Sequence, residues 1–154
     1  MPLEIERKFL VTSDTYRENS NSSEIKQVYL SVIEKMAIRV RIDGLQASLA
    51  IKSKISERVN KEYEYSIPID EARSLMHLDD NLLVIRKTRY IVEYEGRAWE
   101  VDEFHDENDG LIVAEIELDS ENEIFKMPPW IGEEVTADYR YLNSNLAINP
   151  FSKW

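Results

Sequence analysis

From Leu3 to Leu118 the sequence alternates between apolar and polar or charged residues with a period of two, and this feature constrains the fold most. Successive side chains of a β-strand point to opposite faces, so the alternation predicts strands with two chemically different faces. We expect eight strands, at residues 3–11, 25–33, 37–43, 45–55, 59–69, 82–94, 97–104 and 111–119.

Glycines mark the turns between several expected strands. Asp43-Gly44 and Glu95-Gly96 have the composition of two-residue hairpin turns, and Asn108-Asp109-Gly110 that of a slightly longer one. Strands joined by such short turns pair antiparallel, so we expect a mainly antiparallel sheet.

Helical signals are few. Asp70 is expected to cap a short helix, Ser120 and Glu123 form a capping box for a second one, and a last helix is expected to begin near Asp138. The polar stretch 14–23 is expected to be a loop that could hold one helical turn. The first helix would pack with Ala72, Leu75 and Met76, Pro128-Pro129 would end the second, and the last would cover the sheet with Tyr141, Leu142 and Leu146.

Composition bounds the class of protein. The 154 residues are 43% hydrophobic and no linker or repeat divides them, so we expect one domain over residues 1–154. The absence of cysteine excludes disulfides, a thiolate zinc site and a cysteine nucleophile. The net charge of −11 disfavours binding to nucleic acids and anionic membranes. The start MPLEIERKFLV is too charged for a signal peptide and no stretch could span a membrane, so a cytoplasmic location is expected.

The charged faces are sorted by sign from strand to strand. For any single strand, the ordinary interpretation is the solvated face of a half-buried sheet. Across the set, pure carboxylate rows beside pure cation rows favour a functional site. The acidic rows are Glu4 with Glu6, Glu62 with Glu64, Glu100 with Asp102, and Glu115 with Glu117; the basic rows are Arg39 with Arg41 and Lys87 with Arg89, with Lys8 and Lys52 added.

Closure of about eight such strands into a barrel would make one face the lumen. An apolar lumen would give an ordinary packed barrel with a charged surface, and this alternative stays open. A charged lumen would have to hold water, ions and a charged ligand, because unpaired buried charges are costly. Arginines and lysines suit phosphate oxygens, and carboxylates beside them make sense if they hold Mg²⁺ or Mn²⁺. Zinc and copper are disfavoured because the chain has no cysteine and only two histidines.

The ordered motifs resemble the CYTH, or triphosphate tunnel metalloenzyme, superfamily along nearly the whole chain. Its ExExK signature stands here as Glu4, Glu6 and Lys8. QVYL at 27–30, RVR at 39–41, IKS at 51–53, EYE at 62–64, KTRY at 87–90, EVDEF at 100–104, EIEL at 115–118, GEEVT at 132–136 and DYRY at 138–141 follow in order.

The resemblance implies an α+β fold, mainly antiparallel β, in which an eight-stranded closed tunnel barrel has a polar lumen and a few covering helices. It also implies binding of a triphosphate with Mg²⁺ or Mn²⁺. By the same resemblance, phosphate contacts would come from Lys8, Arg39, Arg41, Lys52, Lys87, Arg89 and Arg140. Metal contacts would come from Glu4, Glu6, Glu62, Glu64, Asp102, Glu115 and Glu117, with Glu100 able to serve either role.

The short chain and its EIERKFLV start look like the compact bacterial inorganic triphosphatases, which implies hydrolysis of tripolyphosphate to pyrophosphate and phosphate. Lys87 and Lys52 are candidate proton carriers, because crowding by arginines can lower a lysine pKa, and Tyr29 could partner one of them. The simpler interpretation is that both lysines only bind phosphate.

Two departures from the family pattern stand out. Asn60 occupies a position, two residues before EYE, where similar bacterial members often carry arginine; Arg58 could replace that contact from the same strand face. Tyr139 stands where lysine or proline is common.

Other functions stay open. A class IV adenylate cyclase would use the ribose 3′ hydroxyl of ATP in place of water, and a nucleoside or thiamine triphosphatase would act on an organic triphosphate. A noncatalytic polyphosphate-binding module is disfavoured because an anion binder needs mainly the bases. We expect no nucleic-acid or membrane partner, and the apolar outer strand faces would allow a homodimer.

Overall fold

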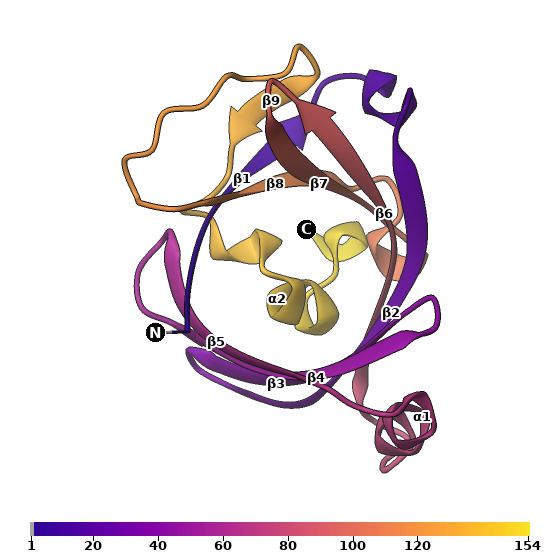
Figure 1. Ribbon diagram of the computed structural model, residues 1–154. Coiled ribbons are helices and arrows are strands. Elements are labelled where there is room, and N and C mark those ends of the chain that lie inside the picture. The colour runs from indigo at the N-terminus through magenta and orange to yellow at the C-terminus, as the bar shows by residue number, and fades with distance from the viewer. Residues whose placement is uncertain (1) are drawn as a thin grey trace.

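The computed structural model describes residues 2–154, in which nine strands form one antiparallel sheet that closes on itself (Figure 1). The order around the sheet is β5-β4-β3-β2-β6-β7-β8-β1, and pairing of β1 with β5 closes the ring. A ninth strand, β9, adds to β1 beyond this ring. The strands are β1 (Leu3–Val11), β2 (Asn21–Ile33), β3 (Met36–Asp43), β4 (Gln46–Lys54), β5 (Val59–Ser66), β6 (Leu83–Tyr94), β7 (Arg97–Phe104), β8 (Ile112–Leu118) and β9 (Ile131–Glu134).

Two α-helices and four single-turn 3₁₀ helices connect or cover the strands of residues 2–154. They are α1 (Ile69–Met76), α2 (Asn143–Ile148), η1 (Thr15–Arg17), η2 (Asp106–Asn108), η3 (Tyr139–Tyr141) and η4 (Phe151–Lys153). Neither α-helix of this described part has the length and apolar character needed to cross a membrane.

Strand β1 closes the barrel by changing partners along its length. Its start, from Leu3 to Ile5, pairs with residues 59–61 of β5. From Ile5 to Leu10 the other edge pairs with β8. At Phe9 and Val11, with a register shift between them, β1 also pairs with the short β9. The ring therefore depends on one strand that joins the two ends of the sheet.

The eight predicted strands are all present, and their mainly antiparallel pairing is confirmed. Strand β2 begins earlier than expected, at Asn21, within the stretch 14–23 assigned to a loop, although η1 supplies the one helical turn there. Strand β5 ends at Ser66, because Pro68 cannot donate to a ladder and the following residues form α1. Strand β9 was not predicted, because four residues are too few to show alternation.

The predicted helix after the capping box at Ser120 is wrong. Residues 119–130 contain no helix. The Glu123 carboxylate instead accepts a hydrogen bond from the Asp119 backbone N–H at 2.7 Å and pairs with Arg97. The acid of the predicted capping box is therefore engaged by partners other than a helix N-terminus.

The other two helix predictions hold with changes. Helix α1 is present, but Pro68 precedes it and Asp70 lies in its first turn without capping it, so the capping role was wrong. The last helix forms as two short pieces, η3 and α2, and Asp138 caps the first by accepting from the backbone N–H of Arg140.

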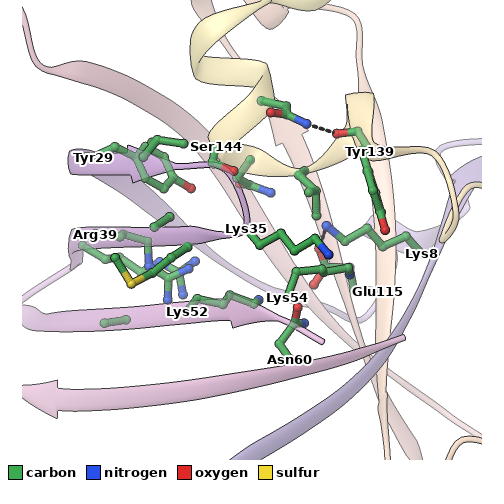
Figure 2. Close-up of a pocket in the computed structure, with 18 of the residues that line it drawn as sticks. Lys8, Tyr29, Lys35, Arg39, Lys52, Lys54, Asn60, Glu115, Tyr139 and Ser144 are labelled. Atoms are coloured by element: carbon green, nitrogen blue, oxygen red, sulfur yellow. Dashed lines mark hydrogen bonds and ion pairs between the residues drawn. The ribbon is translucent and has the colours of Figure 1, made fainter. Parts of the chain in front are cut away.

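The charged faces of the strands point into the barrel, which confirms the predicted polar lumen. Lys8, Arg39 and Lys52 reach into the interior from β1, β3 and β4 (Figure 2). Lys87 and Asp102 are almost completely buried, with 1% and 2% exposure, and lie on neighbouring strands β6 and β7. An ordinary apolar lumen is thereby excluded.

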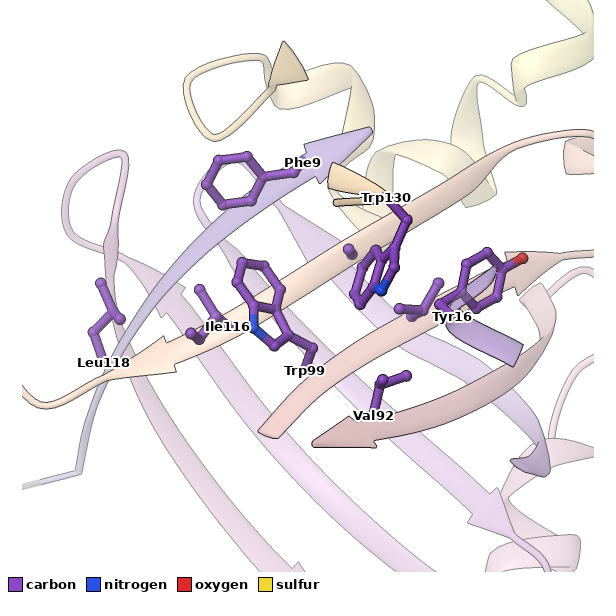
Figure 3. Packing of buried hydrophobic residues seen from close by; sticks show 9 residues of the cluster. Phe9, Tyr16, Val92, Trp99, Ile116, Leu118 and Trp130 are labelled. Carbon is purple, nitrogen blue, oxygen red and sulfur yellow. The ribbon is translucent and has the colours of Figure 1, made fainter. Parts of the chain in front are cut away.

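The apolar faces point outward and are covered unevenly. On β1, β7 and β8 they form a cluster around Trp99 and Phe9, which Tyr16 of η1 and Trp130 before β9 cover (Figure 3). The rings meet edge to face, with centroids 5.7 Å apart for Phe9 and Trp99 and 5.9 Å for Trp99 and Trp130. Helix α1 covers a second outer patch, where Ala72 and Met76 pack against Val28 of β2 and Val40 of β3.

One end of the barrel is closed by the C-terminal segment. Helix α2 and the C-terminus lie within the outline of the ring in Figure 1. Tyr141 and Leu146 pack there against Phe104 and Val113, which stand on the lumen faces of β7 and β8. The predicted role of Tyr141 and Leu146 in covering the sheet is confirmed, but they cover its inner face.

Replacement of Trp99 should test the outer cluster. Trp99→Ala removes a fully buried ring that contacts three other aromatic rings, so we expect a loss of about 3–5 kcal/mol in unfolding free energy by urea denaturation. Tyr65→Ala, at a side chain with 55% exposure on β5, should change it by less than about 0.5 kcal/mol. Equal losses in the two variants would contradict this account of the outer packing.

Candidate active site

One cavity inside the barrel gathers most of the predicted cations. Strands β1, β3, β4 and β6 supply them, and η3 and α2 form part of the wall (Figure 2). The predicted phosphate-binding residues that line this cavity are Lys8, Arg39, Arg41, Lys52, Lys87 and Arg89. Arg140 is not among them: its guanidinium pairs with Asp138 at 2.7 Å and lies over the Trp154 ring.

Asp102 anchors the cations of β6. Its carboxylate accepts from Arg89 Nε at 2.8 Å and Nη2 at 2.9 Å, and Lys87 Nζ lies 2.8 Å away. Burial raises the pKa of Asp102, but Lys87 and Arg89 outweigh it and hold that pKa well below its usual range. Both carboxylate oxygens of this predicted metal ligand are therefore engaged by cations.

Lys87 is held between two acceptors. Its ammonium donates to Asn143 Oδ1 at 2.8 Å as well as pairing with Asp102. Burial, and then Arg89 and Arg41, lower the pKa of Lys87 to about 7 against the attraction of Asp102. Burial likewise lowers the pKa of Arg41 to about 10, together with repulsion from Arg39 and Arg89.

Gln27 connects the cations with the C-terminal wall. It is fully buried, accepts from Arg41 Nε at 3.0 Å, and donates to Tyr29 Oη at 3.0 Å and Asn143 Oδ1 at 3.1 Å. Tyr29 thus reaches Lys87 only through Gln27 and Asn143. The structure brings the predicted pair into one network without a direct contact.

The acids of β1 and β5 gather around Lys52. Its ammonium lies 2.6 Å from Glu4 Oε1, 3.5 Å from Glu6 Oε1 and 3.7 Å from Glu62 Oε2. Burial raises the pKa of Glu6, but the attraction of Lys52 and Lys8 lowers it overall.

The remaining acids are spread around the same lumen. Glu115 lines the cavity 3.5 Å from Lys8 Nζ, and Glu117 faces Glu6 in the β1–β8 register. Glu100 pairs with Arg89 at 2.6 Å, and burial raises its pKa. Glu64 lies 3.4 Å from Arg39 Nη2, and its side chain is half exposed.

Asn60 takes the place of the expected arginine. It is buried and donates to Glu4 Oε1 at 3.1 Å and Glu6 Oε1 at 3.4 Å. The hypothesis that Arg58 replaces that contact is wrong, because Arg58 donates to the Glu121 carbonyl oxygen in the segment after β8. A neutral amide therefore stands beside these acids.

The carboxylate donors suit a hard divalent cation. In residues 2–154 no three acidic or histidine side chains are already arranged as metal ligands. The acids of β1 and β5 nevertheless converge on a single cationic atom, and carboxylate oxygens are the donors that Mg²⁺ and Mn²⁺ prefer. The residues present therefore fit such an ion.

Several cavity residues escaped the sequence prediction. Lys54 lies two residues after Lys52 on the same strand face, so its position carried a usable signal. Lys35 comes from the β2–β3 turn (Figure 2). Asn143 comes from the C-terminal segment, and both reach the cavity only because the chain folds back. Tyr139, noted as a departure from the family pattern, lies in the same wall.

Burial and crowding of acids should destabilise the metal-free protein as the pH rises toward neutral. Burial, and then repulsion from Glu4, Glu100, Glu6 and Glu62, raise the pKa of Glu117 to about 7. A carboxyl with a raised folded-state pKa binds more protons folded than unfolded, so stability falls from about pH 4.5 to about pH 7.

Glu117→Gln should remove this loss. In urea unfolding with a chelator present, we expect the variant to gain about 1 kcal/mol over the wild type at pH 8 and little at pH 5, after allowance for solvent screening. Glu71→Gln, at an exposed helix position, should show no such pH-dependent gain. A gain that is equal at both pH values would refute the explanation.

Comparison with known proteins agrees with this geometry. The CYTH domain model matches residues 2–147. An inorganic triphosphatase of Acetivibrio thermocellus is 44% identical over all of this chain and 99% of its own length, and one of Nitrosomonas europaea is 34% identical over 95% of this chain and 97% of its own. The solved structure of the inorganic triphosphatase NE1496 superposes with a TM-score of 0.69 at 33% identity and 94% coverage of both chains. The chain belongs to the CYTH domain family.

Proposed function

We propose that this chain is a divalent-metal-dependent hydrolase that converts inorganic tripolyphosphate to pyrophosphate and phosphate. The observation that carries the proposal is the gathering of eight arginine and lysine side chains in one cavity beside acids suited to a metal ion. Two relatives similar along the whole chain and named inorganic triphosphatases support the choice of reaction.

The cation arrangement suits a chain of phosphates. Arg39 and Arg41 project from one strand and Lys87 and Arg89 from another, so they face a ligand from different sides. Arg39 Nε is buried without a hydrogen-bond partner among residues 2–154. A buried N–H of this kind is costly unless a ligand oxygen accepts from it, and phosphate oxygens are strong acceptors.

The acids would hold Mg²⁺ or Mn²⁺, with Glu4, Glu6, Glu115 and Glu117 as first choices. Such an ion neutralises charge on the transferred phosphoryl group and can lower the pKa of a bound water. Lys8 and the arginines would bind phosphate oxygens and stabilise the charge that develops on the leaving pyrophosphate. Net charge of −11 does not oppose an anionic substrate, because the local charges of the cavity dominate there.

The two candidate proton carriers differ in their surroundings. Burial lowers the pKa of Lys52, but Glu6, Glu4 and Glu115 raise it overall, so this lysine remains charged and suits phosphate binding. The pKa of Lys87 is lowered to about 7, so this lysine can exchange a proton near neutral pH. We assign proton transfer to Lys87 and phosphate binding to Lys52.

A substrate screen tests the reaction. With Mg²⁺ or Mn²⁺ the protein should release phosphate and pyrophosphate from tripolyphosphate in equal amounts, and a chelator should stop the release. Glu115→Gln should lower metal-dependent turnover at least about 100-fold, or about 2.7 kcal/mol in activation free energy, while Glu71→Gln leaves it unchanged.

Other products would overturn parts of this proposal. Dominant formation of cyclic AMP from ATP would indicate a cyclase, and faster hydrolysis of nucleoside or thiamine triphosphates would change the substrate. Binding of polyphosphate without turnover would indicate a noncatalytic module. Unchanged turnover in Glu115→Gln would remove Glu115 from the metal site.

A pH profile tests the role of Lys87. We expect kcat/KM for tripolyphosphate to rise through about pH 7 as Lys87 loses its proton. Lys87→Arg keeps a permanent charge and should abolish this rise, while Lys61→Arg on the outer face of β5 should retain it. A rise that persists in Lys87→Arg would assign the ionisation to another group.

A further inference from the structure

Lys52 lies at the centre of a cage of acids, and the strand register puts it there. Lys52 on β4 faces Glu62 on β5, while Glu4 on β1 faces Asn60 across the pairing that closes the barrel. The ammonium consequently lies within 3.7 Å of carboxylate oxygens of Glu4, Glu6 and Glu62. We call these three glutamates the acid cage.

The acid cage carries more negative charge than Lys52 can neutralise. Three carboxylates share one ammonium, and Asn60, which donates to two of them, adds no charge. The residues therefore provide a site for cationic charge, partly occupied by a side chain of the protein itself.

Lys8 and Lys87, on other strands of the cavity, are held differently. Lys87 has 1% exposure and is fixed by both Asp102 and Asn143, and Lys8 lies 3.5 Å from the single acid Glu115. The Lys52 side chain is 29% exposed and also lines the cavity of the arginines (Figure 2). A long, flexible lysine side chain at this border can point to the acids or to the cavity.

We propose that Lys52 is an internal counter-ion of the metal site. It neutralises the acid cage before a divalent ion binds, and it turns toward the substrate phosphates when the ion takes its place. The reason is electrostatic: the same carboxylate oxygens cannot favourably hold an ammonium and a divalent ion together. The inference rests on the proposed function, because that function places Mg²⁺ or Mn²⁺ at Glu4 and Glu6, two of the three acids of the cage.

This arrangement couples binding of the metal ion to binding of the substrate, in addition to any direct contact between the two ligands. An ion that displaces Lys52 frees a cation for phosphate, and a phosphate that attracts Lys52 opens the acid cage to the ion. Thermodynamic linkage requires the two effects to be equal. Lys52 thus disfavours the metal ion alone and favours the metal ion together with substrate.

The decisive measurement is the affinity for Mn²⁺ in the absence of substrate. It is determined from the electron paramagnetic resonance signal of free Mn²⁺, which decreases as the ion binds. Lys52→Met should bind Mn²⁺ about tenfold more tightly than the wild type, because no ammonium has to be displaced. Lys52→Arg, which keeps the charge, should bind no more tightly than the wild type. The matched control Lys61→Met removes a lysine from the outer face of neighbouring β5 and should not change the affinity.

A non-hydrolysable methylene analogue of tripolyphosphate adds a second comparison. The analogue should increase Mn²⁺ affinity by a larger factor in the wild type than in Lys52→Met. Wild-type or weaker Mn²⁺ affinity in Lys52→Met, or no Mn²⁺ binding in either protein, would overturn the inference. Circular dichroism and thermal unfolding would verify that each variant is folded.

Chemical labelling tests the same displacement in the unmodified sequence, should Lys52→Met fail to fold. Saturating Mg²⁺ should increase the rate of reductive methylation at Lys52 at least threefold, read by peptide mass spectrometry, and leave Lys61 unchanged. An unchanged rate at Lys52 would refute the displacement. Neither measurement uses turnover, so a protein that hydrolyses tripolyphosphate but fails them refutes only this inference, and an inactive protein that passes them refutes only the reaction.

Discussion

The structure depends on keeping many ionised side chains inside a closed sheet. Removing a charge from water costs several kcal/mol, so the lumen is stable only where each charge meets an opposite one or solvent. Asp102 between Lys87 and Arg89 meets this condition, whereas the single Lys52 ammonium is shared by three glutamates of β1 and β5. Arg39 Nε, buried without a partner in the described chain, shows where the internal pairing is incomplete.

The apolar faces provide the stability that such a lumen does not. With charged residues inside, the hydrophobic core lies on the outer surface of the sheet, around Trp99 and beneath α1. A third apolar group closes one end of the barrel, where Tyr141 and Leu146 meet Phe104. The same segment places Asn143 on Lys87, so the packing that closes the barrel also completes the polar network of the site.

Most of the fold was predictable because alternation is a local property. Every strand of six or more residues was found, since each repeats its pattern several times. Strand β9 has four residues and forms because β1 offers a free edge there. The capping box at Ser120 failed for the opposite reason: its local signal was sound, but Arg97, distant in sequence, pairs with Glu123.

The sequence by itself determined the alternation, the sorting of charges by strand and the motifs of the family, because these depend only on the order of residues. Tertiary structure alone decided that β1 meets β5, and this pairing gathers Glu4, Glu6 and Glu62 on the Lys52 ammonium. It likewise decided that Asn143 faces Lys87 and that Arg140 lies outside the cavity. Ring closure and strand register decide which side chains meet across the lumen. These side chains are far apart in the sequence, so a local sequence pattern does not predict their contacts.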